Sequence, residues 1–166
     1  MKKDANGKEK DVQIDTPVAS LHVNKEVSAT DTGLPVYPGS HRVEEALSDN
    51  NEGATVNVLT GIFGMKVTAV KYETDDPVDK VKDYYRSQLQ KYGNYIECKA
   101  NTIAISPGAE GDSNSKNLVC EQTSGDNIEL KAGTPHNQHA VAIEPLDKGS
   151  RYALVYLQIH EKKDTI

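Results

Sequence analysis

The sequence predicts an α+β domain, a mainly antiparallel β-sheet with one principal amphipathic helix from Pro77 to Tyr92 packed on one face. Three observations indicate this class. One segment has helical periodicity, several short segments alternate apolar and polar residues with period two, and short polar turns separate them. A helix with a single apolar stripe has to bury it, and the strands provide the surface. Consecutive strands joined by short turns pair antiparallel.

The chain's 166 residues suit one domain, because a chain of about 150 residues buries roughly 70% of its unfolded surface. It has no tryptophan, one phenylalanine and eight tyrosines, so aliphatic residues and tyrosines have to fill the core. We expect most tyrosines at the core edge, where their hydroxyl groups find partners. The folded unit is assigned to residues 34–160, after a flexible arm with short edge strands at residues 1–33 and before a frayed tail at residues 161–166.

Residues 12–23 alternate apolar and polar side chains in two short pieces around Pro17, which predicts two strands and a turn. Because proline cannot donate to a ladder, we place these strands at an edge of the sheet or in a hairpin. Residues 24–53, which follow, are polar and aperiodic, and they are too long for a simple connection.

The sequence Leu-Pro-Val-Tyr-Pro-Gly at residues 34–39 interrupts this polar stretch. Its two prolines restrict the backbone, while Leu34, Val36 and Tyr37 offer apolar contacts. We therefore expect the segment to lie extended across the body of the domain. These three residues form the candidate binding surface.

A β-hairpin is predicted for residues 54–62 and 65–73, with Gly61 and Gly64 beside the turn. The principal helix follows it. We expect Asp76 to cap the first turn and Gly93 to end the helix in a left-handed conformation. Its apolar stripe recurs at steps of three or four residues and consists of Val78, Val81, Tyr85, Leu89 and Tyr92.

The rest of the chain supplies further strands. They are predicted at residues 95–99 with a continuation at 103–105, and at 118–121, 128–131, 140–144 and 152–160, with a polar loop at 106–117. The strand at 152–160 is apolar on both faces, which is typical of a central position in a sheet.

Cys98 and Cys120 are the only cysteines, 22 residues apart and each in a strand-like stretch. Two interpretations stay open, a disulfide between neighbouring strands and two buried free thiols. We favour the disulfide if the chain is exported, since disulfides persist in oxidising compartments. Closing a loop of this length stabilises a fold by about 3 kcal/mol in the chain-entropy model.

The formal net charge of −6 argues against non-specific nucleic-acid binding, because that binding requires Lys and Arg to neutralise phosphates. No apolar run approaches the roughly 20 residues of a transmembrane helix. Residues 1–10 are polar and lysine-rich, which is typical of the leader after a cleaved export signal or a lipid-modified cysteine. We therefore expect a removed signal peptide and, in the full-length protein, a lipid anchor.

His136 and His139 are the weak candidates for a metal pair. Pro135 and the strand pattern after it place them in a loop or at a strand start, where their rings need not converge, and no nearby acid completes a motif. Polar turn residues are the favoured interpretation. The sequence also lacks a P-loop, a dinucleotide fingerprint, a nucleophile elbow and an EF-hand loop. We therefore predict no catalytic residue, no metal and no cofactor.

Two segments carry a resemblance: the Leu-Pro-Val-Tyr-Pro-Gly sequence at residues 34–39, and Tyr-Glu-Thr-Asp-Asp-Pro-Val-Asp-Lys-Val-Lys-Asp-Tyr-Tyr-Arg-Ser-Gln-Leu at residues 72–89. Together they resemble a group of uncharacterised bacterial exported or lipid-anchored proteins. Thr-Pro-Val-Ala-Ser-Leu-His-Val at residues 16–23 also looks like a segment of such envelope proteins. The resemblance covers under a third of the chain. It implies an address in the bacterial periplasm or cell envelope and carries no active site.

Our leading hypothesis is a non-enzymatic cell-envelope domain that binds a protein or a small molecule on the sheet face or beside the helix. Two alternatives stay open. The first is an enzyme whose site is assembled from scattered residues, with His136, His139 and an acid. The second is a structural assembly module that pairs through the strands at residues 12–23.

Overall fold

The computed structural model describes residues 2–3, 9–24, 27–43, 53–60, 63–101, 117–120 and 122–161. The strands are β1 (Lys2–Lys3), β2 (Glu9–Asp15), β3 (Ala19–Asn24), β4 (His41–Arg42), β5 (Gly53–Thr60), β6 (Phe63–Thr74), β7 (Tyr95–Ala100), β8 (Asn127–Thr134), β9 (Asn137–Pro145) and β10 (Ser150–Glu161). The helices are η1 (Ala29–Thr32), α1 (Val78–Leu89) and η2 (Gln90–Tyr92), of which η1 and η2 are short 3-10 turns.

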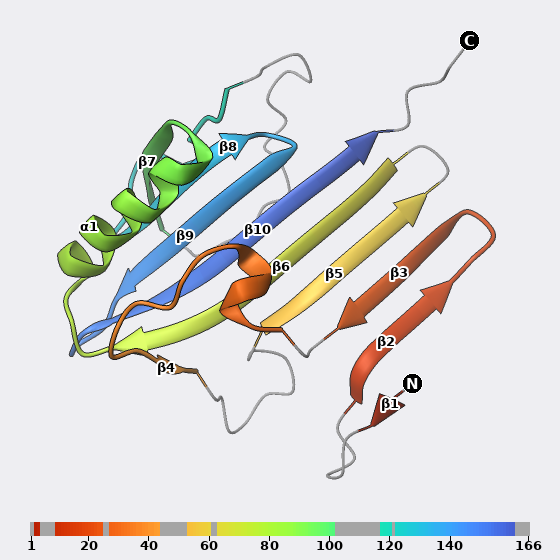
Figure 1. Ribbon diagram of the computed structural model, residues 1–166, viewed down its shortest axis with the longest axis horizontal. Coiled ribbons are helices and arrows are strands. Elements are labelled where there is room, and N and C mark those ends of the chain that lie inside the picture. Colours follow the sequence, from red (N-terminus) through yellow and green to blue (C-terminus); the bar gives the residue numbers. More distant parts are fainter. Residues whose placement is uncertain are drawn as a thin grey trace.

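Within the described residues, the strands form one ten-stranded sheet in the order β1-β2-β3-β5-β6-β10-β9-β8-β7, with β4 beside β6. Every strand pair is antiparallel. The helix α1 crosses in front of the sheet at its β7–β9 side, and the segment that contains η1 crosses in front of β6 and β10 (Figure 1). The predicted class, a mainly antiparallel sheet with one principal helix, is confirmed.

The centre of the sheet is the long pairing between β6 and β10, and β9 pairs with the other side of β10. The central position predicted for the strand at residues 152–160 is therefore confirmed. Its alternating side chains face opposite ways: Tyr152 and Leu154 lie in the main core, whereas Ala153 and Val155 belong to a second apolar cluster. We call the surface that carries α1 the helix face and the opposite surface the reverse face.

The helix was predicted correctly in place and in its buried stripe. Val81, Tyr85 and Leu89 are each 0% exposed, packed against the main core. The α-helical part is shorter than predicted, because η2 continues it to Tyr92 as a 3-10 turn. The hairpin is confirmed as well, since β5 and β6 pair directly; its turn at residues 61–62 lies outside the described residues.

The role predicted for Asp76 at the start of the helix is wrong. The N-cap residue is Pro77, and no side chain caps the first turn. Asp76 instead accepts hydrogen bonds from the Tyr37 hydroxyl (2.7 Å), a distant residue in the sequence, and from Lys80 Nζ (3.1 Å), one helical turn later, in place of the free amides. Gly93 ends the helical segment as predicted, as the C-cap of η2 and with a positive φ of 108°, although its ψ of −159° differs from the left-handed helical value.

The boundary predicted between an arm and a folded unit at residues 33 and 34 lies inside a segment whose two sides both contact the core. Residues 27–43 pack across the helix face, and Val27 and Ala29 are 6% and 5% exposed within the same core as the helix. The strands predicted at residues 12–23 are present as β2 and β3, at the end of the sheet that α1 does not reach (Figure 1). Because this region is mostly polar, the sequence did not indicate that Val27, Ala29 and Thr32 are buried.

Residues 118–120 have no strand structure, although a strand was predicted there. The predicted continuation at residues 103–105, most of the loop predicted at 106–117 and nearly all of the predicted tail lie outside the described residues. Within the described part of the chain, α1 and the shorter helical turns fall short of the length and apolar character that a membrane crossing requires.

Candidate functional site

Tyrosine hydroxyl groups fasten residues 34–40 to the helix face. The Tyr85 hydroxyl donates to the carbonyl oxygen of Pro35 at 2.8 Å, and the Tyr152 hydroxyl donates to Ser40 Oγ at 2.9 Å. The Tyr152 oxygen also accepts the backbone N–H of Tyr37 at 3.1 Å. Burial raises the pKa of both Tyr85 and Tyr152, so these hydroxyl groups stay protonated and able to donate.

The candidate binding surface Leu34, Val36 and Tyr37 is divided by this packing. Leu34 is 2% exposed and belongs to the core, whereas Val36 is 36% exposed. The Tyr37 ring meets the Tyr84 ring edge-on at a centroid distance of 5.2 Å. Its hydroxyl donates to the Asp76 carboxylate, which raises the pKa of Tyr37 to about 12. Leu34 is therefore core, Tyr37 is half-buried and held by other side chains, and Pro35, Val36, Pro38 and Gly39 are exposed.

The two histidines occupy different environments. The His139 ring is stacked between the rings of Tyr92 and Tyr156, and its Nδ1–H donates to the carbonyl oxygen of Thr32 at 2.8 Å. Burial lowers the pKa of His139, so the neutral ring is favoured. His136 is exposed in the turn between β8 and β9. No group of three or more His, Cys, Asp or Glu able to hold a metal occurs among the residues described.

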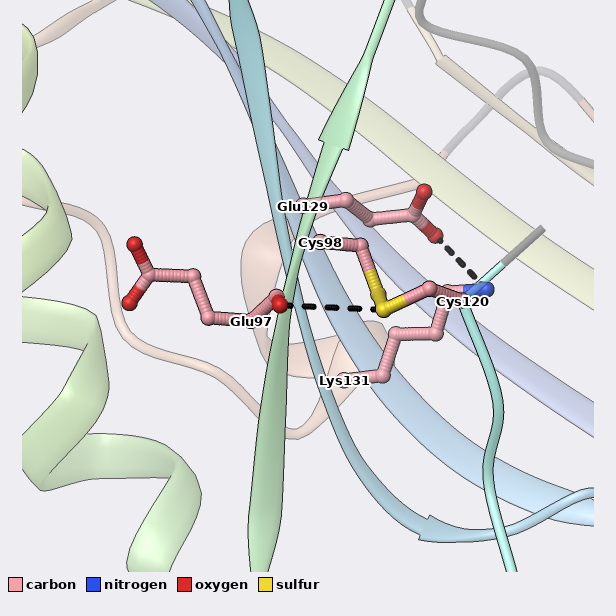
Figure 2. The surroundings of a disulfide bond; sticks show 5 residues. All are labelled: Glu97, Cys98, Cys120, Glu129 and Lys131. Atoms are coloured by element: carbon pink, nitrogen blue, oxygen red, sulfur yellow. Dashed lines mark hydrogen bonds and ion pairs between the residues drawn. A yellow bond between two sulfur atoms is a disulfide. The ribbon is translucent and has the colours of Figure 1, made fainter. Parts of the chain in front are cut away.

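Cys98 in β7 and Cys120 form a disulfide, with their Cα atoms 5.4 Å apart. The bond lies on the same side of β7 and β8 as the Glu129–Lys131 ion pair, whose nearest atoms are 3.2 Å apart (Figure 2). Cys120 Sγ contacts the Glu97 carbonyl oxygen at 3.6 Å, while the Glu97 carboxylate points away toward the helix (Figure 2). The favoured interpretation of the two cysteines is confirmed.

The disulfide adjoins a second restraint on the end of β7. The backbone N–H of Asn101 donates to Gln122 Oε1 at 2.8 Å, and Asn127 Nδ2 donates to the Asn101 carbonyl oxygen at 3.4 Å. The disulfide and these two hydrogen bonds hold Asn101 beside the start of β8. Asn101 is thereby placed at the rim of a pocket.

The pocket has a volume of about 270 Å³ and is lined by Lys71, Asn101, Asn127, Glu144, Arg151, Tyr152 and Ala153. These residues come from β6, the end of β7, β8, β9 and β10. Strand register explains the gathering: Arg151 lies directly opposite both Glu73 and Glu144, and Lys71 lies opposite Ala153. Since Ala153 belongs to the reverse-face cluster, the pocket opens on the reverse face.

The charged groups of the pocket are not all paired. Arg151 donates to Glu73 Oε1 through Nε at 2.8 Å and through Nη2 at 2.6 Å. The structure shows no hydrogen bond or ion pair, to any described residue, for the Lys71 ammonium or the Glu144 carboxylate. Among the described residues, the pocket therefore has one positive group without a partner, Lys71, and one negative group without a partner, Glu144. The side-chain amides of Asn101 and Asn127 also line it.

Sequence reasoning did not identify this pocket. The signal in the sequence was faint: Lys71, Glu144 and Arg151 are charged residues near the ends of strands whose other positions are mostly apolar. These three residues come together only through the register of three strands, and no local sequence pattern indicates that register. The predicted site residues Leu34, Tyr37, His136 and His139 are all absent from the pocket lining.

Comparisons of the chain with protein-family models, with curated proteins and with solved structures gave no match.

Replacing both cysteines with alanine is expected to lower the free energy of unfolding by about 3 kcal/mol, since the unfolded chain regains the entropy of an open loop. Urea unfolding of the oxidised wild type and of the Cys98→Ala, Cys120→Ala double variant measures this difference. Dithiothreitol should lower the stability of the wild type and leave the double variant unchanged. Equal stability of the two oxidised proteins would contradict the prediction.

Asp76 is expected to make stability depend on acid pH. Its hydrogen bonds with Tyr37 and Lys80 lower the pKa of the carboxyl group in the folded state. That contribution to stability is present above the unfolded pKa and is lost as the pH falls through the folded pKa. Asp76→Asn should therefore flatten the decline in stability below about pH 4. Denaturation at several pH values tests this, and Asp75→Asn, the exposed neighbouring position, is the control. An unchanged slope for Asp76→Asn is the contrary outcome.

Proposed function

We propose that this protein is a non-enzymatic binding domain of the bacterial cell envelope that holds a small polar molecule in the reverse-face pocket. The observation that carries the proposal is that Lys71 and Glu144 both line a pocket of about 270 Å³ and have no ion-pair or hydrogen-bond partner among the described residues. Concave sites with a few convergent polar groups are where proteins bind small molecules. A charged group that has no partner in the protein can bind a ligand without first breaking an existing hydrogen bond or ion pair.

Binding is favoured over catalysis by the residue types present. The described lining residues include no serine, threonine, cysteine or histidine, and the hydroxyl of the lining residue Tyr152 donates to Ser40 Oγ, so the lining supplies no nucleophile with an adjacent imidazole base. His139, the buried histidine of the enzyme alternative, is engaged with Thr32 and two tyrosine rings on the helix face. An enzyme assembled from His136, His139 and an acid therefore has less support than a binding domain.

The envelope address is supported by the Cys98–Cys120 disulfide, which suits an oxidising compartment. A fusion of the gene to a reporter that is active in only one compartment, together with a test for lipid modification, examines this address directly.

Titration followed by NMR tests the binding function. A panel of small polar molecules, including amino acids, sugars, dicarboxylates and inorganic phosphate, is added to the labelled protein. We expect at least one to shift the backbone amide signals of Ala153 and Asn127 saturably. Lys71→Met or Glu144→Gln should weaken that binding about tenfold, the effect of losing roughly 1.4 kcal/mol from a charge-assisted hydrogen bond.

Lys148→Met and Asp147→Asn are the matched controls, because both residues are exposed in the turn between β9 and β10 and do not line the pocket. They should bind the same molecule as tightly as the wild type does. A panel without any saturable shift at these signals would falsify the proposed function.

Assembly through the sheet edge is the second candidate function. Ile14 in β2, next to the two-residue edge strand β1, is 51% exposed, and among the described residues β1 pairs with β2 only at Glu9 and Asp11. An exposed apolar edge strand is a template for pairing with another chain. If this function holds, light scattering should show oligomers that Ile14→Glu dissociates. Val18→Glu is the control, because Val18 is 78% exposed in the turn and outside the strands. A monomer at all concentrations excludes it.

A further inference from the structure

We infer that the ligand of the reverse-face pocket is a small zwitterion of the α-amino-acid class, with its carboxylate on Lys71 and its ammonium group on Glu144. This inference rests on the proposed function and names the chemistry of the molecule bound. It follows from which charges in the pocket are available, from how far apart they are anchored and from the size of the space between them.

Arg151 contributes little net charge to the pocket. Two of its guanidinium nitrogens donate to the same Glu73 oxygen at 2.6 and 2.8 Å, which neutralises the cation within the protein. His41 Nε2 lies 3.6 Å from the other Glu73 oxygen. Among the described residues, the charges of the pocket that lack a partner are therefore one cation, Lys71, and one anion, Glu144.

Strand register separates these two groups. Lys71 lies opposite Ala153 on β10, and Glu144 lies opposite Arg151, two residues earlier on the same strand. β6 and β9 are two strand spacings apart, about 10 Å, and two residues along a strand span about 7 Å. The two backbone anchors are therefore about 12 Å apart. Both side chains can extend toward a ligand that lies over Ala153, whose methyl group is a small floor.

A singly charged ligand fits this arrangement poorly. Filling the pocket removes water from both protein charges, and a charge that loses its water without gaining a partner raises the free energy of the complex. A carboxylate alone would leave Glu144 unpaired, and an amine alone would leave Lys71 unpaired. A zwitterion pairs with both Lys71 and Glu144. The pocket therefore disfavours a singly charged ligand, because that ligand leaves one protein charge unpaired.

Size and the remaining polar groups narrow the class further. The volume of about 270 Å³ is several times the roughly 30 Å³ that one water molecule takes in the liquid, so the pocket has room for a small organic molecule. Asn101 and Asn127 line the pocket on the side of β7 and β8 and can donate to or accept from a polar side chain of the ligand. An α-amino acid with a polar side chain has this size and these groups.

Three probes of matched shape test the inference. L-Glutamine carries both charges, glutaramic acid lacks the ammonium group, and 4-aminobutanamide lacks the carboxylate. Calorimetry, with NMR shifts at Ala153 and Asn127, measures each against the whole chain. We expect L-glutamine to bind saturably and each singly charged probe to bind at least about tenfold more weakly, since each loses one charge-assisted contact.

The variants assign each charge to its partner. Lys71→Met should reduce the affinity for L-glutamine about tenfold while leaving that for 4-aminobutanamide nearly unchanged, because the latter has no carboxylate to lose. Glu144→Gln should show the converse with glutaramic acid. Lys148→Met should change neither value. Dispersed amide spectra of each variant establish that it is folded.

The outcomes separate this inference from the function on which it rests. If glutaramic acid or 4-aminobutanamide binds as tightly as L-glutamine, the zwitterion inference is overturned and the pocket remains a binding site. The same conclusion follows if a sugar or phosphate shifts the pocket signals and L-glutamine does not. If no molecule of the wider panel shifts them, both proposals fall.

Discussion

The continuous pairing of β6 with β10 is the interaction on which the rest of the structure depends. The two strands run antiparallel from the Thr74–Ser150 pair to the Phe63–Glu161 pair. Because successive side chains on a strand point to opposite faces, this one register assigns every residue of both strands to a face. Tyr72 and Tyr152 go to the helix face, and Lys71 and Arg151 go to the reverse face. A shift by one residue would exchange the two sets and destroy both the core and the pocket.

The helix face meets a second constraint, the hydroxyl groups of its tyrosines. A chain without tryptophan fills much of its core with tyrosine rings, and each buried ring brings a polar atom that needs a partner. Here the partners are backbone and side-chain groups of residues 33–40. Tyr85 bonds to Pro35, Tyr152 bonds to Ser40, and Tyr92 bonds to Gly33. The polar segment is therefore held in place by the core, and in return it satisfies the core's polar atoms.

The reverse face carries charged side chains that come from three neighbouring strands. Arg151 and Glu73 neutralise each other across neighbouring strands, while Lys71 and Glu144 are too far apart in register to lie directly opposite one another. The disulfide and the Asn101–Gln122 hydrogen bond restrain the end of β7 next to them. The result is a small polar space between rigid strands, which is a more precise support for a ligand than a free loop.

Local patterns in the sequence determined the class of fold, the place of the helix and its buried stripe, the hairpin of β5 and β6 and the central position of β10. These features can be predicted from the periodicity of neighbouring residues, because each element only has to bury its own apolar face. Other features required contacts between distant segments. Asp76 looks like a helix cap in the sequence, yet Tyr37, 39 residues earlier, binds its carboxylate. Residues 27–33 look like a solvated arm, yet they pack against the tyrosines.

The charged pocket shows the same limit most clearly. The sequence by itself determined that Lys71, Glu144 and Arg151 are charged residues in strands, and it left the choice between a disulfide and free thiols open. Only the tertiary structure decided that three strands align these residues on one face, that Glu73 neutralises Arg151, and that Lys71 and Glu144 are left without a described partner. The reason is that strand register is set by the summed packing of whole strands, and no short segment of the sequence contains that sum.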